Sequence, residues 1–425
     1  MKSLSLARRR AIIPVLSELL LIGLSAWPTA RVAWSAEPDK KAPAATGAGK
    51  KQEPPDLLPI PDGTPEQIIQ HLEKLSQMEP PARDPKTIEE FSRKVGAAAL
   101  QAAEKILAKK PNPEQAAYAV NVKLEVLAML DQSGQKDAFA KLQAFPAELQ
   151  KLGWPQLARL AGGVLLQARL ARAEGAGAED LKKLVEDIRK HLAAGPLDPA
   201  DSGLAVSAAL AAERVDRAGL AVKAYEDFAK VFSASKDDRM KAFGVKLQGA
   251  ARRLTLLGKP LEVRGVTVDG KPLDWAQYRG KVVLVAFWAT WCGPCRVEIG
   301  NILKSYEAYH DKGFEVVAVS MDLKKPDLES FLAENKLPWT VLYDQALHTD
   351  AADNTMDTRY GIITIPELIL VGSDGKVVSM DVRGRGLGRE LAKLLSPPES
   401  PKPKAAKASE PAKAGKAKQG KTGGD

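Results

Sequence analysis

The sequence predicts an α/β domain near the C-terminus, preceded by an all-helical domain. Between residues 62 and 257, apolar residues recur at spacings of three and four, as on one face of a helix. Between residues 258 and 396, apolar runs suited to strands alternate with helix-like segments, which is typical of a mixed sheet with helices on both faces. The length of 425 residues is enough for roughly two or three domains.

The helical region is predicted to hold about eight helices of roughly 15–25 residues, because Pro, Gly and Asn breaks recur along it. Asp84, Asn112 and Asp198 each precede a proline, an arrangement that favours a helix start with the acidic or amide residue as N-cap. Helix pairs that repeat about every 40 residues resemble a degenerate tetratricopeptide-like solenoid. An irregular helical bundle explains the same pattern.

The C-terminal region contains five segments that are expected to form strands. Apolar runs buried on both faces are typical of central strands in a sheet. Ser373-Asp374-Gly375 between the last two segments is a hairpin signal. The five segments are Val282–Trp288, Phe314–Ser320, Trp339–Tyr343, Glu367–Val371 and Val377–Val382.

The net charge of +9 is concentrated at the two ends of the chain. Residues 1–35 and 397–425 each carry an excess of basic residues, so the region between them is nearly neutral and no nucleic-acid partner is expected. Residues 1–35 combine basic, apolar and small-residue parts in the order of a cleaved signal peptide, with an uncleaved membrane anchor as the alternative. Residues 36–61 are expected to be a disordered linker, and residues 397–425 a disordered Lys/Ala/Pro-rich tail. An exported location, the periplasm or its equivalent, follows from this N-terminus.

The two cysteines of the chain lie in the segment Phe287–Cys295, which reads Phe-Trp-Ala-Thr-Trp-Cys-Gly-Pro-Cys. This segment follows a predicted strand and opens a predicted helix. A helix N-terminus offers unpaired N–H groups and a positive dipole end, and both favour the thiolate that attacks a disulfide. The two-residue spacer allows the second thiol to resolve a mixed disulfide. We therefore predict Cys292 as the exposed nucleophile and Cys295 as the more buried resolving thiol.

The neighbouring residues fit this chemistry and exclude others. Pro294 lies in the first helical turn, where a missing N–H costs least, and Gly293 adds no side chain over the attacking sulfur. Trp291, just before the first cysteine, is also predicted to support the active site. A zinc site needs about four ligands, but no second cysteine pair exists. Haem attachment needs a histidine after the second cysteine, where Arg296 stands. An inert structural disulfide is the remaining alternative.

At these residues the sequence resembles the thioredoxin superfamily, and most of all its exported TlpA/ResA-type branch, over residues 259–396. Tyr278–Val285, which leads into the Phe-Trp-Ala-Thr-Trp run, matches the branch's approach to the cysteines. Tyr360-Gly361 followed by Ile365-Pro366 matches its second landmark. The resemblance implies a thioredoxin fold, with a cis Pro366 facing the disulfide. It also implies that the Ile365 backbone lies beside Cys292, ready to pair with a substrate strand.

Three further positions bear on the mechanism by comparison with this family. Ala286 replaces the buried aspartate of thioredoxin itself, and Glu298 matches a glutamate that the exported branch often carries one turn after the second cysteine. Glu298 is expected to exchange a proton with Cys295, or else to be an exposed surface residue. Glu367 departs from the usual threonine after the cis proline. Its carboxylate is expected to oppose thiolate formation and screen out acidic partners, or to point to solvent.

The leading functional hypothesis is an exported enzyme that reduces or exchanges disulfides of protein substrates. No flavin or nicotinamide motif is present, so the Cys292–Cys295 pair is the expected redox group, no cofactor or metal is expected, and an upstream membrane thiol reductase is expected to recharge it. Cytochrome c biogenesis is one activity of the family. A scaffold whose helical region binds a partner protein is a second hypothesis. A peroxiredoxin-type peroxidase is disfavoured, because Ala289 stands where those enzymes carry threonine.

Overall fold

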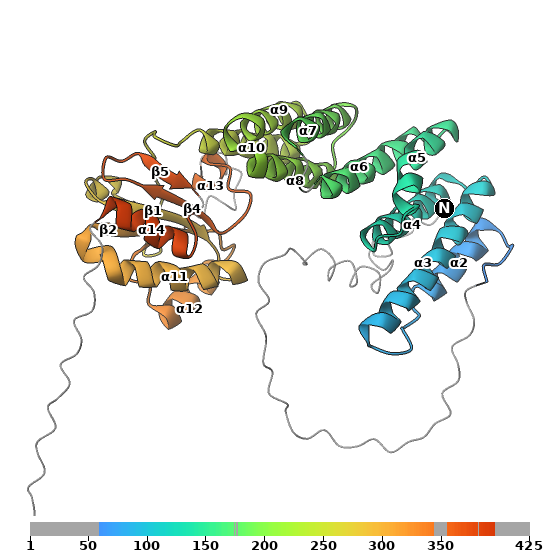
Figure 1. The fold of residues 1–425 in the computed structure, drawn as a ribbon, viewed down its shortest axis with the longest axis horizontal. Coiled ribbons are helices and arrows are strands. Elements are labelled where there is room, and N and C mark those ends of the chain that lie inside the picture. Colours follow the sequence, from blue (N-terminus) through green and yellow to red (C-terminus); the bar gives the residue numbers. More distant parts are fainter. Residues whose placement is uncertain (1–58, 174, 176, 344–354, 381, 396–425) are drawn as a thin grey trace, which may run out of the picture. The chain divides into compact units, whose positions relative to one another are not determined.

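A computed structural model describes residues 59–173, 175, 177–343, 355–380 and 382–395 (Figure 1). The chain divides into two compact units between Leu247 and Gln248. The predicted signal peptide, nearly all of the predicted linker and the predicted tail lie outside the described residues.

The helical unit confirms the all-α prediction, with α-helices of 11 to 24 residues and a short π-helix, Arg217–Ala221, before the helix α9. None of the described helices has the length and apolar character needed to cross a bilayer. The helices are α2 (Pro65–Leu75), α3 (Pro85–Ala108), α4 (Pro113–Gln132), α5 (Ala138–Lys151), α6 (Pro155–Arg172), α7 (Ala178–Ala193), α8 (Pro199–Val215), α9 (Val222–Ser233) and α10 (Asp238–Leu254).

The helix starts lie where the sequence predicts them. The side chains of Asp84, Asn112 and Asp198 each accept a hydrogen bond from a backbone N–H in the first turn of α3, α4 and α8. A proline follows each cap, at a position where its missing N–H costs nothing to the helix. Short polar side chains and prolines therefore fix three of the helix boundaries.

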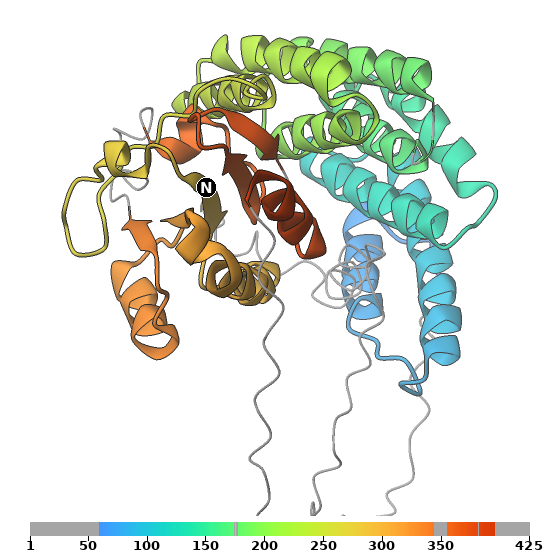
Figure 2. The ribbon, with the colours of Figure 1, turned by 60° about the vertical axis from the view of Figure 1, so that its left-hand side comes forward.

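Each helix of this unit packs mainly on its neighbours in the sequence. Consecutive helices from α2 to α8 are in contact, and α4 also contacts α6, α6 contacts α8, and α7 contacts α9. In Figure 2 the cyan and green helices lie side by side in this order. A nearest-neighbour pattern of this kind is typical of helical-repeat architectures.

The C-terminal unit contains a five-stranded mixed sheet with the strand order β3-β2-β1-β4-β5. The strands β1, β2 and β3 are parallel, and β4 runs antiparallel to both β1 and β5. This arrangement confirms the predicted thioredoxin fold. The strands are β1 (Val282–Trp288), β2 (Phe314–Ser320), β3 (Thr340–Tyr343), β4 (Glu367–Val371) and β5 (Val377–Met380).

Alternate residues of the strands enter two separate cores, one on each face of the sheet. On β1, Leu284 and Ala286 face the core that is shared with α11 (Gly293–Tyr309), α12 (Lys325–Asn335) and α14 (Arg385–Leu394). Val285 and Phe287 face the opposite core, which includes a residue of α13 (Met356–Arg359). Because β1 is buried on both faces, its sequence is a continuous apolar run.

The division between the units lies inside α10, upstream of the predicted junction at residues 257–258. The last turns of α10 pack closely on the C-terminal unit. A Cβ atom on Gly249 would lie 2.1 Å from the carbonyl oxygen of Thr358 and 2.7 Å from the amide nitrogen of Gly361. The prediction placed the boundary at the change in composition, but this helix end belongs by its contacts to the second unit.

Candidate active site

The cysteine pair lies at the C-terminal end of β1, where α11 begins. Cys292 and Cys295 form a disulfide with their Cα atoms 5.2 Å apart. Cys292 is the N-cap residue of α11, and its Sγ atom lies 3.2 Å from the backbone nitrogen of Cys295. Once the disulfide is reduced, this N–H and the helix dipole would stabilise a thiolate on Cys292.

The prediction of an exposed Cys292 is wrong, because both cysteines are buried, but Cys292 is the less buried of the two, as the predicted roles require. Cys292 is 6% exposed and Cys295 is 1% exposed. Gly293 and Pro294 lie between them in the first turn of α11, and Trp291 just before them is 68% exposed. An incoming sulfur would therefore reach Cys292 before Cys295.

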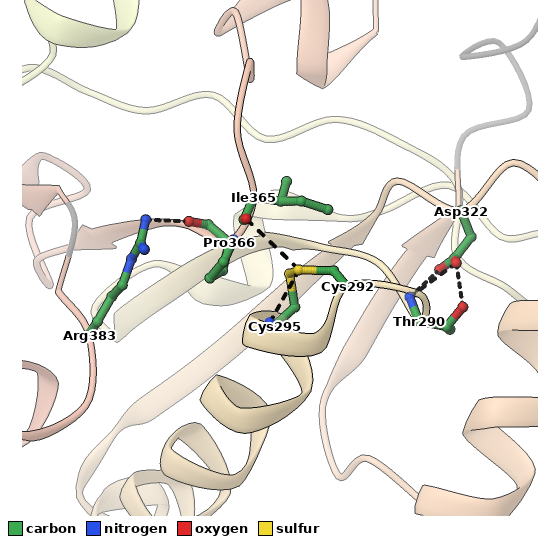
Figure 3. Close-up of a disulfide and its surroundings, with 7 residues drawn as sticks. All are labelled: Thr290, Cys292, Cys295, Asp322, Ile365, Pro366 and Arg383. Carbon is green, nitrogen blue, oxygen red and sulfur yellow. Dashed lines mark hydrogen bonds between the residues drawn. A yellow bond between two sulfur atoms is a disulfide. The ribbon is translucent and has the colours of Figure 1, made fainter. Parts of the chain in front are cut away.

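The peptide bond between Ile365 and Pro366 is cis, as predicted. The carbonyl oxygen of Ile365 lies 3.8 Å from the Sγ atom of Cys292. Figure 3 shows Ile365 and Pro366 beside the disulfide. The backbone just before β4 is thus positioned where an extended substrate segment at Cys292 could pair with it.

A buried carboxylate holds the turn that precedes the disulfide. Asp322 is 1% exposed, and it accepts hydrogen bonds from the backbone N–H of Thr290 at 3.0 Å and from the Thr290 hydroxyl at 2.6 Å. The hydroxyl of Ser320, the last residue of β2, donates to the same carboxylate at 2.8 Å. Asp322 therefore ties the end of β2 to the turn that carries Trp291 and Cys292 (Figure 3).

Glu298 is 7% exposed, so the prediction of an exposed surface residue is wrong and the buried alternative holds. Its carboxylate accepts hydrogen bonds from the side-chain amide of Asn301 at 3.0 Å and from the backbone N–H of Gly384 at 2.8 Å. Glu298, Cys295 and Ala286 line one small apolar cavity with free space of about 10 Å³, close to that of one water molecule. A carboxylate is thus held on the same side of the sheet as the resolving thiol.

Both predictions for the Glu367 carboxylate are wrong. The side chain is buried and forms an ion pair with Arg253 of α10, with Arg253 Nη1 and Glu367 Oε1 2.8 Å apart. Glu367 pairs in register with Phe287, and its neighbour Leu368 enters the core on the Cys295 side, so Glu367 faces the opposite core. The carboxylate is neutralised away from the disulfide, and it neither opposes thiolate formation there nor meets solvent.

The loop before α14 also contacts the site, through Arg383 and Gly384. The guanidinium of Arg383 donates a hydrogen bond to the carbonyl oxygen of Pro366 at 2.6 Å, and the backbone N–H of Gly384 donates to Glu298. Arg383 and Gly384 thus hold the cis proline and the buried glutamate, respectively.

Sequence reasoning missed four residues of the site: Arg253, Asp322, Arg383 and Gly384. Arg253 contacts a residue 114 positions away, so no local pattern reveals the ion pair. The position of Asp322 could have been recognised from the sequence, because it lies two residues after a buried parallel strand whose end lies beside the end of β1. Side chains at this edge of the sheet converge on the site.

Comparisons with known proteins find similar thiol-disulfide oxidoreductases. A family model described as Redoxin matches residues 226–393. A curated relative, the thiol-disulfide oxidoreductase ResA of Bacillus thuringiensis, is 28% identical over 128 residues, which cover 30% of this chain and 69% of that protein. ResA of Halalkalibacterium halodurans is 27% identical over 132 residues, covering 31% of this chain and 71% of that protein.

A similar solved structure is the thioredoxin domain of a thiol-disulfide oxidoreductase from Bacteroides vulgatus. It is 31% identical and covers 32% of this chain and 96% of that domain, with a TM-score of 0.29. These three matches cover about a third of the chain or less. They concern the unit that carries the disulfide.

Proposed function

We propose that this chain, whose residues 226–393 match the Redoxin family model and which is similar to ResA, is a thiol:disulfide oxidoreductase that reduces or exchanges protein disulfides in an exported compartment. The observation that carries the proposal is the position of Cys292. Its sulfur caps α11 and lies 3.8 Å from the Ile365 carbonyl oxygen. The nucleophile is therefore next to a backbone segment with which a substrate strand could pair. Thioredoxin-fold enzymes need both features for attack on a polypeptide disulfide.

The proposed reaction begins from the reduced protein. The Cys292 thiolate attacks one sulfur of the substrate disulfide, and the other substrate sulfur leaves as a thiolate that takes up a proton. The Cys295 thiolate then attacks the Cys292 sulfur of the mixed disulfide and releases the second substrate thiolate. Two electrons pass to the substrate, and the protein ends with the Cys292–Cys295 disulfide of the structure.

Glu298 is proposed to take the proton from Cys295 when that thiol attacks the mixed disulfide. The carboxylate and the thiol line the same small cavity, on one side of the sheet, which brings the proton acceptor near the resolving thiol. Asn301 and Gly384 hold the carboxylate by hydrogen bonds, so its position does not depend on substrate. Ala286 brings no carboxylate to this cavity, which leaves Glu298 as its acidic residue.

The direction and the setting of the reaction rest on sequence features. The Gly293-Pro294 spacer resembles that of thioredoxin and favours reduction over oxidation of substrates. The signal-like residues 1–35 support export, and a membrane thiol reductase would supply the two electrons for each turnover. A binding role for the helical unit stays a prediction.

Trapping of the mixed disulfide tests the proposal. In a Cys295→Ser variant of the full chain, the resolving step is blocked and substrate proteins should remain bound to Cys292. The matched Cys292→Ser variant should trap nothing and should not reduce a model protein disulfide such as insulin. Undiminished insulin reduction by Cys292→Ser would contradict the proposal.

A further inference from the structure

The disulfide is surrounded by segments that fix one another. The loop after β2 is tied to the turn before Cys292 by the hydrogen bonds between Asp322 and Thr290. The loop before α14 is tied to Pro366 by Arg383 and to Glu298 by Gly384. Figure 3 shows the Asp322 and Arg383 contacts on opposite sides of the sulfur atoms. The side chains that these segments expose therefore border the path to Cys292.

Three large apolar side chains on these segments are exposed. Trp291, next to the nucleophile, is 68% exposed, and Val297 on α11 and Leu323 after β2 are each 71% exposed. Exposed apolar side chains that gather around a reactive group mark a contact surface. This surface suits a polypeptide with apolar residues near its reactive sulfur.

The same segments expose cationic side chains. We call Arg296, Lys324 and Arg385 the basic rim; all three are exposed, and Arg296 extends over the ring of Phe331 on α12 at 5.9 Å. Arg296 and Lys324 lie at the α12 side of the disulfide, and Arg385 follows the Gly384 contact on the other side. The rim residues thus belong to, or directly follow, the segments that hold the disulfide.

The carboxylates of these segments are buried and already hydrogen-bonded. Asp322, Glu298 and Glu367 are 1%, 7% and 6% exposed, and each accepts from a partner inside the protein. Within the described residues of segments 289–298, 320–324, 363–367 and 382–385, the exposed charged side chains are therefore all cationic. The next exposed carboxylate along the chain after Lys324 is Asp327.

We propose that the basic rim selects protein substrates whose reacting cysteine is flanked by acidic residues and has an apolar neighbour. This inference rests on the proposed disulfide chemistry and adds to it the chemical class of the substrate. Glu367 would have repelled such substrates if it were exposed at the site, but Arg253 neutralises it in the opposite core. The acidic residues would lie beside the rim while the apolar neighbour contacts Trp291 or Leu323.

The physical effect of the rim is mainly on the rate of encounter. Charges of one sign around a site raise the association rate of oppositely charged partners, by roughly tenfold or more at low ionic strength. Exposed charges are screened over about 10 Å at 0.1 M salt, so the preference should weaken as salt is added. Dependence on both substrate charge and salt is the signature of such selection.

The experiment uses the reduced full chain and three disulfide-bonded peptides of equal length. They share a Leu next to the reacting cysteine, and the flanking residues are all Asp, all Ser or all Lys. Single-turnover rate constants are measured by thiol labelling and chromatography at low and high salt. At low salt the Asp peptide should react about tenfold faster than the Ser peptide, the Lys peptide should be slowest, and the ratios should approach one at about 0.5 M salt.

A variant of the rim tests which residues cause the preference. In Arg296→Gln/Lys324→Gln/Arg385→Gln, the ratio of Asp-peptide to Ser-peptide rates should fall to about twofold or less. Because a general loss of activity lowers both rates equally, it leaves this ratio of rates unchanged. The matched control Lys259→Gln/Arg279→Gln/Lys304→Gln removes three exposed cations from other parts of the same unit and should keep the wild-type ratio.

The outcomes separate the inference from the proposed function. Equal rates for the three peptides at low salt, or an unchanged ratio in the rim variant, would overturn the inference while leaving disulfide reduction intact. A lower ratio in the control variant as well would assign the preference to net charge rather than to the rim, and would also overturn it. If the wild type reduces none of the peptides and no insulin, the proposed function itself fails.

Discussion

Arg253 and Glu367 form an ion pair in which both side chains are almost fully buried, 4% and 8% exposed, with Nη1 and Oε1 2.8 Å apart. Glu367 directly follows the cis proline, and Arg253 lies in the last turn of α10. A charge at this position of β4 requires a buried counter-charge, because an unpaired ion in a protein interior is costly.

Removal of one partner of this pair should strongly destabilise the protein. In Arg253→Met, the Glu367 carboxylate loses its guanidinium, and the free energy of unfolding of the C-terminal unit should fall by about 3 kcal/mol. Urea denaturation followed by tryptophan fluorescence measures the change. The double variant Arg253→Met/Glu367→Leu should recover most of the loss, since two apolar side chains can replace a buried ion pair. A single variant as stable as the wild type would contradict this account of Glu367.

Replacement of Glu298 should affect proton transfer more than folding. Glu298→Gln preserves the shape and can still accept from Gly384, but it cannot take a proton. Exchange with insulin should slow by about tenfold, less than the largest general-base effects because water can substitute, and the pH profile of the rate should shift. Asn301→Ala is the control, because it removes one hydrogen bond and keeps the carboxylate. If rate and pH profile are both unchanged in Glu298→Gln, the proton leaves Cys295 by another path.

Asp322→Asn should loosen the turn that carries the nucleophile. The Asp322 carboxylate now accepts hydrogen bonds from Thr290 and Ser320. The amide of asparagine keeps one oxygen acceptor, but its NH₂ group would face one of these donors and could not accept from it. A hydrogen bond to a charged group contributes about 1.5–3 kcal/mol, so we expect a lower thermal midpoint and slower exchange. Asp327→Asn on the exposed start of α12 is the matched control and should change neither. An Asp322 variant with wild-type melting and kinetics would refute the positioning role.

The helical unit has a pH-sensitive contact of its own. Burial raises the pKa of Asp201, but hydrogen bonds from His191 and Arg159 outweigh this effect and hold the pKa below the ordinary value of about 3.8 for an aspartate. A lowered folded-state pKa stabilises the fold above the unfolded-state value, and this stabilisation is lost as the pH falls through the folded-state value. Asp201→Asn should therefore lower the urea midpoint, followed by helical circular dichroism, at pH 7, and the difference from wild type should shrink below about pH 3.8. A difference that is constant from pH 7 to pH 3 would exclude this origin.

The sequence predicts much of this fold because its signals are local. The strands β1, β2 and β4 have the predicted bounds, since each is an apolar run with a clear break on either side. At β3, the predicted first residue, Trp339, lies just outside the strand. The cysteine motif and the cis proline were also recognisable, because the resemblance depends on short contiguous segments. Residue contacts across the fold carry no such signal.

The parts that the sequence could not predict all depend on tertiary contacts. The side chain of Glu367 could be placed only once the register of β4 and the position of α10 were known. The burial of Glu298 likewise depends on the loop at Gly384, which lies 86 residues further along the chain. Periodicity assigns a residue to a helix face, but it does not identify what packs on that face.

The close approach of Gly249 to Thr358 and Gly361 limits how freely this redox domain can be separated or transplanted. A fragment that begins at residue 259, where the composition changes, would discard both this interlocking helix turn and the cation that balances Glu367. A fragment that begins at residue 248 keeps both. The separable redox domain therefore begins within α10, and fusion or domain-swapping experiments should cut the chain before the last two turns of this helix.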